Sequence, residues 1–125
     1  MNFEKLQEFV LDWADDKDLL HEENAGKQFM KFMEEAMEFY DAFKTYDCLD
    51  TFYWLDDLAK MIYEVDLKPP RDDMMMEFGD VLVTLCILAK QLDIDPVDCL
   101  HMAYIKISKR KGKTIDGVFV KEEDL

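Results

Sequence analysis

The sequence contains little glycine and little proline. Only 4 glycines and 3 prolines occur among its 125 residues, which is too few for the many tight turns of an all-β protein. Half of the residues are apolar and 13% are aromatic, so a hydrophobic core can form and disorder is not expected. We therefore expect an all-α fold, with a single domain that spans residues 1–125.

Disulfide bonds, a leader peptide and membrane segments are not indicated either. The 3 cysteines are odd in number and show no CxxC spacing, so we expect them to be reduced. The chain does not start with a charged and then apolar leader, and no apolar run approaches the length that crosses a bilayer. These absences predict a cytoplasmic protein that does not contact a membrane.

Positive charge is scarce. The chain has 15 Lys and Arg against 29 Asp and Glu, and its formal net charge of -14 argues against general nucleic-acid binding, because phosphate backbones would be repelled. For most of the carboxylates we expect a solvated surface position. The cations are unevenly placed, however, and five of them fall between positions 106 and 113: Lys106, Lys109, Arg110, Lys111 and Lys113.

Apolar residues recur with helical spacing over five segments. The expected helices run from Asn2 to about Ala14, from Asn24 to about Phe43, over 50–65, from about Arg71 to Gln91, and from Asp95 to near Gly112. The Pro69-Pro70 pair separates the third helix from the fourth, and Asp116-Gly117 predicts a tight turn or a short hairpin. We expect a compact bundle of about five helices, with a four-helix-bundle-like core that is completed by oligomerisation.

Apolar stripes define the inward face that we expect for two of these helices. The stripe of the second helix comprises Phe29, Phe32, Met33, Ala36, Phe39, Tyr40 and Phe43. The stripe of the third helix comprises Phe52, Leu55, Leu58, Ala59, Ile62 and Tyr63.

The fourth expected helix is the most informative segment. From Phe78 to Ala89 it is apolar on every side, which is typical of a helix buried in its own core or between subunits. Glu77 and Asp80 lie side by side at its leading end. Two adjacent carboxylates beside a buried helix repel each other unless they are protonated, paired with cations or bound to a metal. The alternative is that they only complement the helix dipole.

The second expected helix repeats this acidic spacing. Glu35 and Glu38 are three residues apart and about 60° apart around the helix axis. If the two helices pack with their acidic stripes facing, four carboxylates converge, and oxygen ligands in that number suit Mg²⁺ or Mn²⁺. The alternative is a solvated acidic face.

The basic cluster fits the same chemistry. Lys106 and Arg110 are four residues apart on the expected fifth helix, so they share a face and can contact phosphate oxygens. Lys113 follows four residues after Lys109, beyond the helix. For Lys109 and Lys111 we expect instead that they offset the helix dipole.

These motifs resemble those of a known family. The segments KFMEEAME (31–38) and EFGD (77–80) are similar to the EExxE…ExxD signature of the MazG-like all-α nucleoside triphosphate pyrophosphohydrolases. The spacing of Lys106 and Arg110 is similar to the basic helix of that family, and residues 110–124 resemble the C-terminal segment of its small, often phage-associated members. The gap between Glu38 and Glu77 is longer than in many members, because it holds the helix expected over 50–65.

The resemblance implies Mg²⁺-dependent hydrolysis of a nucleoside or deoxynucleoside triphosphate to the monophosphate and pyrophosphate by a homodimer or homotetramer. The implied metal ligands are Glu35, Glu38, Glu77 and Asp80, the implied phosphate ligands are Lys106, Arg110 and Lys113, and Glu34 or Glu38 is our candidate for accepting a proton from the attacking water. Asn24, Lys27 and Gln28 precede the acidic motif and are candidates for contacting the base or the sugar.

Two other functions stay open at this point. Asp18-x-x-His21 and Asp98-x-x-His101 are similar to half of a di-iron motif, so a ferritin-like carboxylate-bridged metal protein is one alternative. For both histidines a structural role is the simpler expectation. A non-catalytic acidic interaction module is an alternative from a different class.

Overall fold

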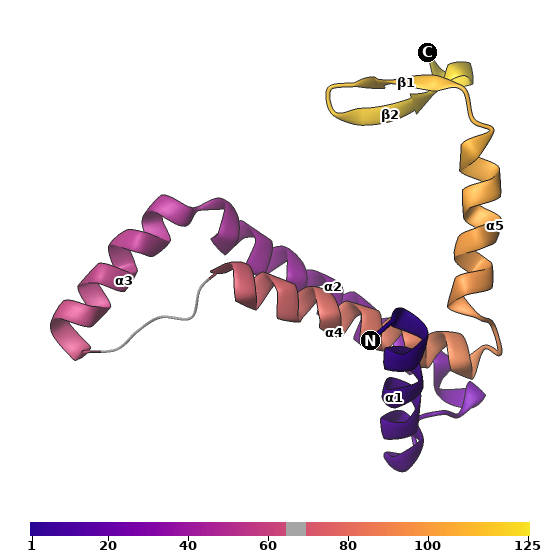
Figure 1. The fold of residues 1–125 in the computed structure, drawn as a ribbon, viewed down its shortest axis with the longest axis horizontal. Helices are drawn as coiled ribbons and strands as arrows, with labels where there is room; N and C mark the ends of the chain where they lie inside the picture. The colour runs from indigo at the N-terminus through magenta and orange to yellow at the C-terminus, as the bar shows by residue number, and fades with distance from the viewer. Residues whose placement is uncertain (65–69) are drawn as a thin grey trace. The chain divides into compact units, whose positions relative to one another are not determined.

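The computed structural model describes residues 1–64 and 70–125, apart from the side chains of 49–52. In this part of the chain five α-helices are followed by one short β-hairpin (Figure 1). The all-α prediction with a C-terminal hairpin is therefore confirmed. The chain divides into two compact units, Met1–Asp93 and Ile94–Leu125, which are described in turn. No helix of the described residues is long and apolar enough to cross a bilayer.

Four helices build the first unit. They are α1 (Phe3–Asp16), α2 (Ala25–Asp47), α3 (Leu49–Tyr63) and α4 (Pro70–Gln91), and a 3-10 turn, η1 (Glu22–Asn24), precedes α2. The predicted starts of all four lie within one residue of the observed ones. The predicted ends of α1 and α2 were two and four residues too early. The predicted break at Pro69 lies outside the described residues.

The caps of the first two helices differ. Asn2 caps α1 as predicted, because its Oδ1 accepts a hydrogen bond from the Lys5 backbone N–H at 2.8 Å. Asn24 also occupies the predicted cap position of α2, but its side chain makes no capping hydrogen bond. The chain enters α2 through η1 instead, and the Asn24 N–H donates to the His21 carbonyl at 3.0 Å.

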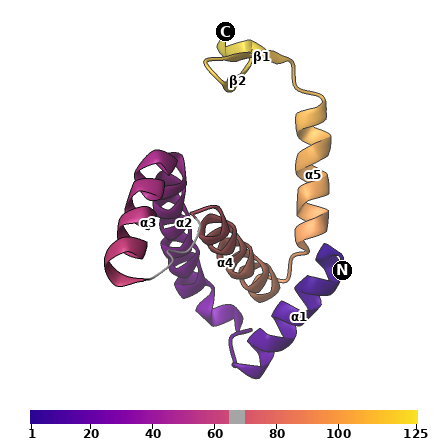
Figure 2. The same cartoon turned by 60° about the vertical axis from the view of Figure 1, so that its left-hand side comes forward.

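Helices α2 and α4 form the antiparallel pair at the centre of this unit, and they run side by side in both views (Figures 1 and 2). Near one end Gln28 Nε2 donates to the Thr84 carbonyl at 3.4 Å, and further along the Phe39 and Phe78 rings meet edge to face with centroids 5.4 Å apart. The buried residues of α4 include Thr84, Cys86, Ile87, Leu88 and Ala89. Burial of each large aliphatic side chain stabilises the fold by about 1.5–3 kcal/mol.

The apolar all-round part of α4 is therefore buried in its second half, as predicted, and burial raises the pKa of the Cys86 thiol. Phe78 is 49% exposed in the single chain, so it is not buried in the chain's own core, and burial between subunits stays a prediction there. This part of α4 lies next to the acidic residues described below.

The inward faces predicted for α2 and α3 need correction. On α2 the buried residues are Glu35 and Ala42. Four members of the expected α2 stripe are exposed instead: Phe29, Met33, Tyr40 and Phe43. On α3 the exposed members are Leu55, Leu58, Ile62 and Tyr63. Helical spacing identifies an apolar face, but it does not identify the surface that covers this face.

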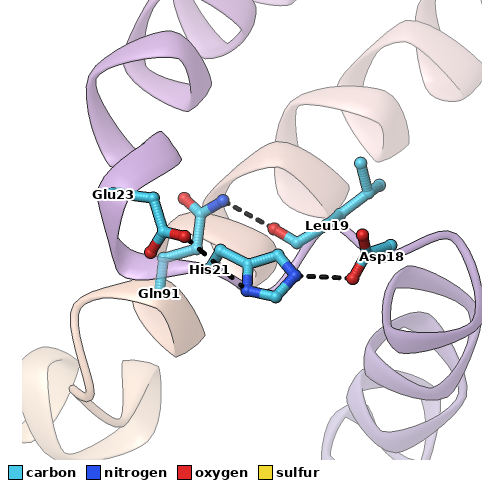
Figure 3. Close-up of polar contacts among 5 residues, drawn as sticks. All are labelled: Asp18, Leu19, His21, Glu23 and Gln91. Carbon is cyan, nitrogen blue, oxygen red and sulfur yellow. Dashed lines mark hydrogen bonds and ion pairs between the residues drawn. The ribbon is translucent and has the colours of Figure 1, made fainter.

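The connection between α1 and α2 is fixed to the last turn of α4 (Figure 3). The buried Gln91 donates from Nε2 to the Leu19 carbonyl at 2.8 Å. Beside it, the His21 ring is hydrogen-bonded to the Asp18 carboxylate, and this bond raises the pKa of His21. The hydrogen bond between Gln91 and Leu19 holds the entry to α2 against α4.

The second unit begins with α5 (Pro96–Ser108). Asp95 caps it as predicted, because its Oδ1 accepts a hydrogen bond from the Val97 N–H at 2.8 Å and Pro96 takes the first helical position. The helix ends at Ser108, four residues before the predicted end at Gly112. Arg110 consequently lies outside the helix, so the prediction that it shares a helical face with Lys106 was wrong.

The hairpin consists of β1 (Gly112–Ile115) and β2 (Val118–Lys121) and is followed by a 3-10 turn, η2 (Glu122–Asp124). Its two turn residues have left-handed backbones, with φ of 51° at Asp116 and 79° at Gly117. This is the turn that Asp-Gly favours between antiparallel strands, so the predicted hairpin is confirmed. The register places Gly112 opposite Lys121, at the end of the hairpin nearest to α5 in the chain.

Candidate functional site

The pairing of α2 with α4 brings acidic residues of both helices together. One carboxylate oxygen each from Glu35, Glu77 and Asp80 lies within 4.8 Å of the other two. These residues come from the neighbouring helices α2 and α4. On each helix the acids are three residues apart and so lie on one face. Of the four carboxylates predicted to converge, the structure brings these three together, and Glu38 is not within this distance. We call Glu35, Glu38, Glu77 and Asp80 the acidic group.

Glu38 is the exposed member of the acidic group on α2. Repulsion from Glu35 raises its pKa above the ordinary value for a glutamate, and a hydrogen bond to Glu35, desolvation and the charge of Glu77 act in the same direction. Lys31 opposes the shift. Glu38 is thus linked electrostatically to acids from both helices, and its proton affinity is higher than that of a solvated glutamate.

The environment of Glu35 shows that the acidic group fits a cation. The residue is only 9% exposed, and its Oε2 is buried without a hydrogen-bond donor among the described residues. A buried polar atom without a partner costs about 1–3 kcal/mol, and a cation at this oxygen would remove that cost. The donors are all carboxylate oxygens, which suits Mg²⁺, Mn²⁺ or Ca²⁺ better than zinc.

Neither histidine belongs to the acidic group in the described part of the chain. His21 lies on the α1–α2 connection and is hydrogen-bonded to Asp18, whereas His101 is an exposed residue of α5. The Glu-x-x-His ligands of di-iron bundles project into one shared site. These positions give no support to the ferritin-like alternative.

Lys31 lies one turn before Glu35 on α2. Its Nζ is 3.1 Å from Glu35 Oε1 and 3.5 Å from Glu34 Oε2, and these contacts, above all the one with Glu35, raise the pKa of Lys31. Glu34 is exposed and takes no part in the acidic group. Of the two candidates for a proton acceptor, only Glu38 therefore adjoins the acids of α4. Sequence reasoning had given Lys31 no role, although its i, i+4 spacing to Glu35 was a visible signal.

The three residues expected to contact the nucleotide lie at the start of α2. Asn24 is half-buried in η1, and Lys27 is exposed on the first turn. Gln28 is half-buried, and its amide is already engaged by the Thr84 carbonyl of α4. Gln28 therefore contributes to the packing of α2 against α4.

The second unit holds a basic pocket with a volume of about 520 Å³. It is lined by Lys106, Lys109, Arg110, Lys111, Lys121, Glu122 and Glu123. The Glu122 N–H donates to the Lys111 carbonyl at 2.8 Å, which brings the end of β2 to the segment after α5. None of the five cations forms an ion pair with any residue that the structure describes, so their charge is available to an anion.

The pocket differs in three ways from the predicted phosphate ligands. Lys106 and Arg110 both line it, although Arg110 does so from the segment after the helix. Lys113 lies on β1 and is not among the lining residues. Lys109 and Lys111 were expected to offset the helix dipole, but they line the pocket. Lys121 also lines it and was not predicted, because it lies ten positions after Lys111 in the sequence and only the pairing of β1 with β2 brings it there.

The two units differ in charge. Residues 1–93 contain 23 acidic and 9 basic side chains, whereas residues 94–125 contain six of each. The first unit thus carries the whole net charge of -14, and the acidic group sits within it. The basic pocket belongs to a unit that is neutral in total but has its cations gathered at one place.

Comparison of the chain with protein-family models, with curated proteins and with solved structures finds no match.

Proposed function

We propose that this protein is a Mg²⁺-dependent hydrolase that cleaves a nucleoside or deoxynucleoside triphosphate into the monophosphate and pyrophosphate. The observation that carries the proposal is the meeting of Glu35, Glu77 and Asp80 from two antiparallel helices, with a buried Glu35 oxygen that has no donor among the described residues. The resemblance of residues 31–38 and 77–80 to the EExxE…ExxD signature supports the choice of reaction.

The acidic group would hold the metal through Glu35, Glu77 and Asp80, with Glu38 beside them. Mg²⁺ bound there would neutralise the negative charge of the phosphate oxygens and position the α-phosphorus for attack by water. In the proposed reaction a water oxygen forms a bond to the α-phosphorus, the bond from that phosphorus to the α–β bridging oxygen breaks, and pyrophosphate leaves.

Glu38 is our proposed acceptor for the proton that the attacking water gives up. It is exposed, so water reaches it, and it lies one turn from Glu35, beside the carboxylates that would hold the metal. Glu34 does not suit this role, because its carboxylate faces Lys31 outside the acidic group.

The basic pocket of the second unit is our proposed site for phosphate oxygens. Arg110 offers a planar fork of donors, and Lys106, Lys109, Lys111 and Lys121 offer mobile charges. Five cations against two carboxylates leave the pocket positive, which favours a multiply charged anion.

We also propose that the protein acts as a homo-oligomer. Support comes from an apolar groove of about 340 Å³ between α1 and α4, lined by Leu6, Phe9, Val10, Trp13 and Val83. In the single chain Phe9 and Trp13 remain about half exposed, at 48% and 52%. Apolar surface of this kind on a small domain is typical of a face that a partner covers.

The test of the proposed reaction is a panel of the common nucleoside and deoxynucleoside triphosphates with Mg²⁺, in which pyrophosphate and orthophosphate are measured separately. We expect equal amounts of monophosphate and pyrophosphate from at least one substrate. Asp80→Asn should lower this rate at least about 100-fold, because a metal ligand is lost, whereas Glu34→Gln should keep most of it.

Two results of this panel would contradict the proposal. Release of orthophosphate alone would place the cleavage at a different bond. Absence of turnover with every triphosphate, in a sample shown to be folded by circular dichroism, would favour the non-catalytic interaction module.

A further inference from the structure

Lys31 places a positive charge directly on the most buried carboxylate of the acidic group. Its Nζ lies 3.1 Å from Glu35 Oε1, while the second oxygen of Glu35 has no donor in the described residues. The Glu35 side chain is 11% exposed, whereas that of Lys31 is 52% exposed. The ammonium group thus reaches in from solvent and compensates part of a charge that is otherwise held in the protein.

This contact is easily exchanged. Lys31 and Glu35 are four residues apart on one helix, and pairs of this kind contribute only a few tenths of a kcal/mol. The lysine stem has four rotatable carbons, so its head can move into solvent or towards Glu34, which is already within 3.5 Å. A divalent cation on the same carboxylate would experience repulsion from Lys31 at short range.

We infer that Lys31 is a built-in counter-ion of the acidic group, which competes with the divalent cation for Glu35 and thereby weakens metal binding. The inference rests on the metal site of the proposed function. Its consequence is that the unchanged chain binds the divalent cation measurably but less tightly than its carboxylates would without Lys31, and that phosphate oxygens of the substrate strengthen retention of the ion. Lys31 would in this way link metal loading to the presence of the triphosphate.

The alternative to competition is that Lys31 positions Glu35 for the metal, and this alternative predicts weaker metal binding when Lys31 is replaced. If Lys31 only held Glu35 in the geometry that a metal needs, its removal would leave Glu35 poorly placed and weaken metal binding. The sign of the change in affinity therefore separates competition from positioning.

The test is a calorimetric titration of the full chain with Mn²⁺ alone, without nucleotide. Lys31→Met removes the charge and keeps most of the apolar stem, Lys31→Gln repeats the removal with a polar side chain, and Lys31→Arg keeps the charge. Lys44→Met is the matched control, because Lys44 lies on the same helix and pairs with Asp41 at 3.2 Å, away from the acidic group.

We expect Lys31→Met and Lys31→Gln to bind Mn²⁺ about three- to tenfold more tightly than the unchanged chain, which is the scale of one partly screened charge at this distance. Lys31→Arg and Lys44→Met should remain within about twofold of the unchanged chain. Equal or weaker binding by both uncharged variants would overturn the inference while leaving the metal site intact. Absence of Mn²⁺ binding in every protein, the unchanged chain included, would overturn the proposed function itself.

Discussion

At the scale of single residues, the acidic group contains an electrostatic conflict, which is the repulsion between Glu35 and Glu38. Glu35 is buried and Glu38 is one turn away, so the Glu35 carboxylate raises the cost of ionising Glu38. Conflicts of this kind are common where a protein binds a cation, because the ion removes the repulsion when it binds. Protonation of Glu38 and the charge of Lys31 are two partial substitutes for that ion.

The raised pKa of Glu38 predicts how stability depends on pH. Because the folded state binds this proton more tightly than the unfolded state, the contribution of Glu38 to stability falls as pH rises from its ordinary pKa through its folded pKa. In the presence of a chelator at pH 7–8, Glu38→Gln should therefore melt at a higher temperature than the unchanged chain. The difference should vanish towards pH 4, and thermal melts followed by circular dichroism measure it.

Glu34→Gln is the control for this prediction, since Glu34 is exposed on the same helix and outside the acidic group. It loses the contact to Lys31 and should not gain stability. A melting temperature of Glu38→Gln at or below that of the unchanged chain at pH 7–8 would show that Glu38 is not under repulsion.

At the scale of secondary-structure elements, the basic pocket depends on where a helix ends and a hairpin begins. Arg110 and Lys111 follow the end of α5 at Ser108, and the pairing of β1 with β2 returns Lys121 to them. The pocket thus combines cations that are local in sequence with one that only the hairpin supplies. Its lining excludes Lys113, although this residue has the same charge and lies nearby in sequence.

This arrangement makes a prediction that separates the lining cations from their neighbour. Lys106→Ala and Arg110→Ala should each weaken the binding of inorganic tripolyphosphate about three- to tenfold, as expected for one charge-assisted contact at a solvated site. Lys113→Ala should stay within about twofold, and added salt should weaken binding in all variants. Isothermal titration calorimetry measures the affinities. An equal loss in Lys113→Ala would mean that the anion responds to general charge and not to this pocket.

Sequence reasoning succeeded at this scale where the signals are local. Caps and turns at Asn2, Asp95 and Asp116-Gly117 gave correct element boundaries, because the hydrogen bond or backbone angle that sets each boundary involves residues only a few positions apart. The end of α5 was misplaced at Gly112, because the helix ends at Ser108 with Lys109 as its C-cap, and Gly112 instead begins β1 opposite Lys121.

For the candidate site, the spacing of acids in the sequence identified the carboxylates that meet. The burial of Glu35 became visible only from the packing of α2 against α4 in the structure. The i, i+3 repeat predicted that acids of α2 and α4 would meet, and they do. It could not show that Glu35 is the buried member, because the apolar stripe on α2 is only partly covered: Phe39 packs on Phe78 of α4, whereas Met33 and Tyr40 are exposed. Which side of a helix is covered depends on its partner, and a single sequence does not contain that information directly.

At the scale of the whole molecule, apolar surface exceeds what one copy covers. The groove between α1 and α4 exposes Phe9 and Trp13. We expect size-exclusion chromatography with light scattering to give a mass of two or four times 14.8 kDa. Trp13→Glu should lower this mass, because a charge in the groove opposes burial.

Lys17→Gln changes the net charge by the same amount as Trp13→Glu. Lys17 is an exposed residue at the C-terminal cap of α1, so its replacement should leave the mass unchanged. A mass of 14.8 kDa for the unchanged chain, or dissociation by Lys17→Gln to the same extent, would contradict the proposed assembly.

Mn²⁺ binding followed by electron paramagnetic resonance decides whether carboxylates of two helices hold one divalent ion. We predict saturable binding to the unchanged chain, a loss of at least about tenfold in affinity in Glu35→Gln and in Asp80→Asn, and no more than a twofold change in Glu34→Gln. Binding that is equally reduced in all three variants, or that does not saturate in the unchanged chain, would contradict a metal site shared by the two helices.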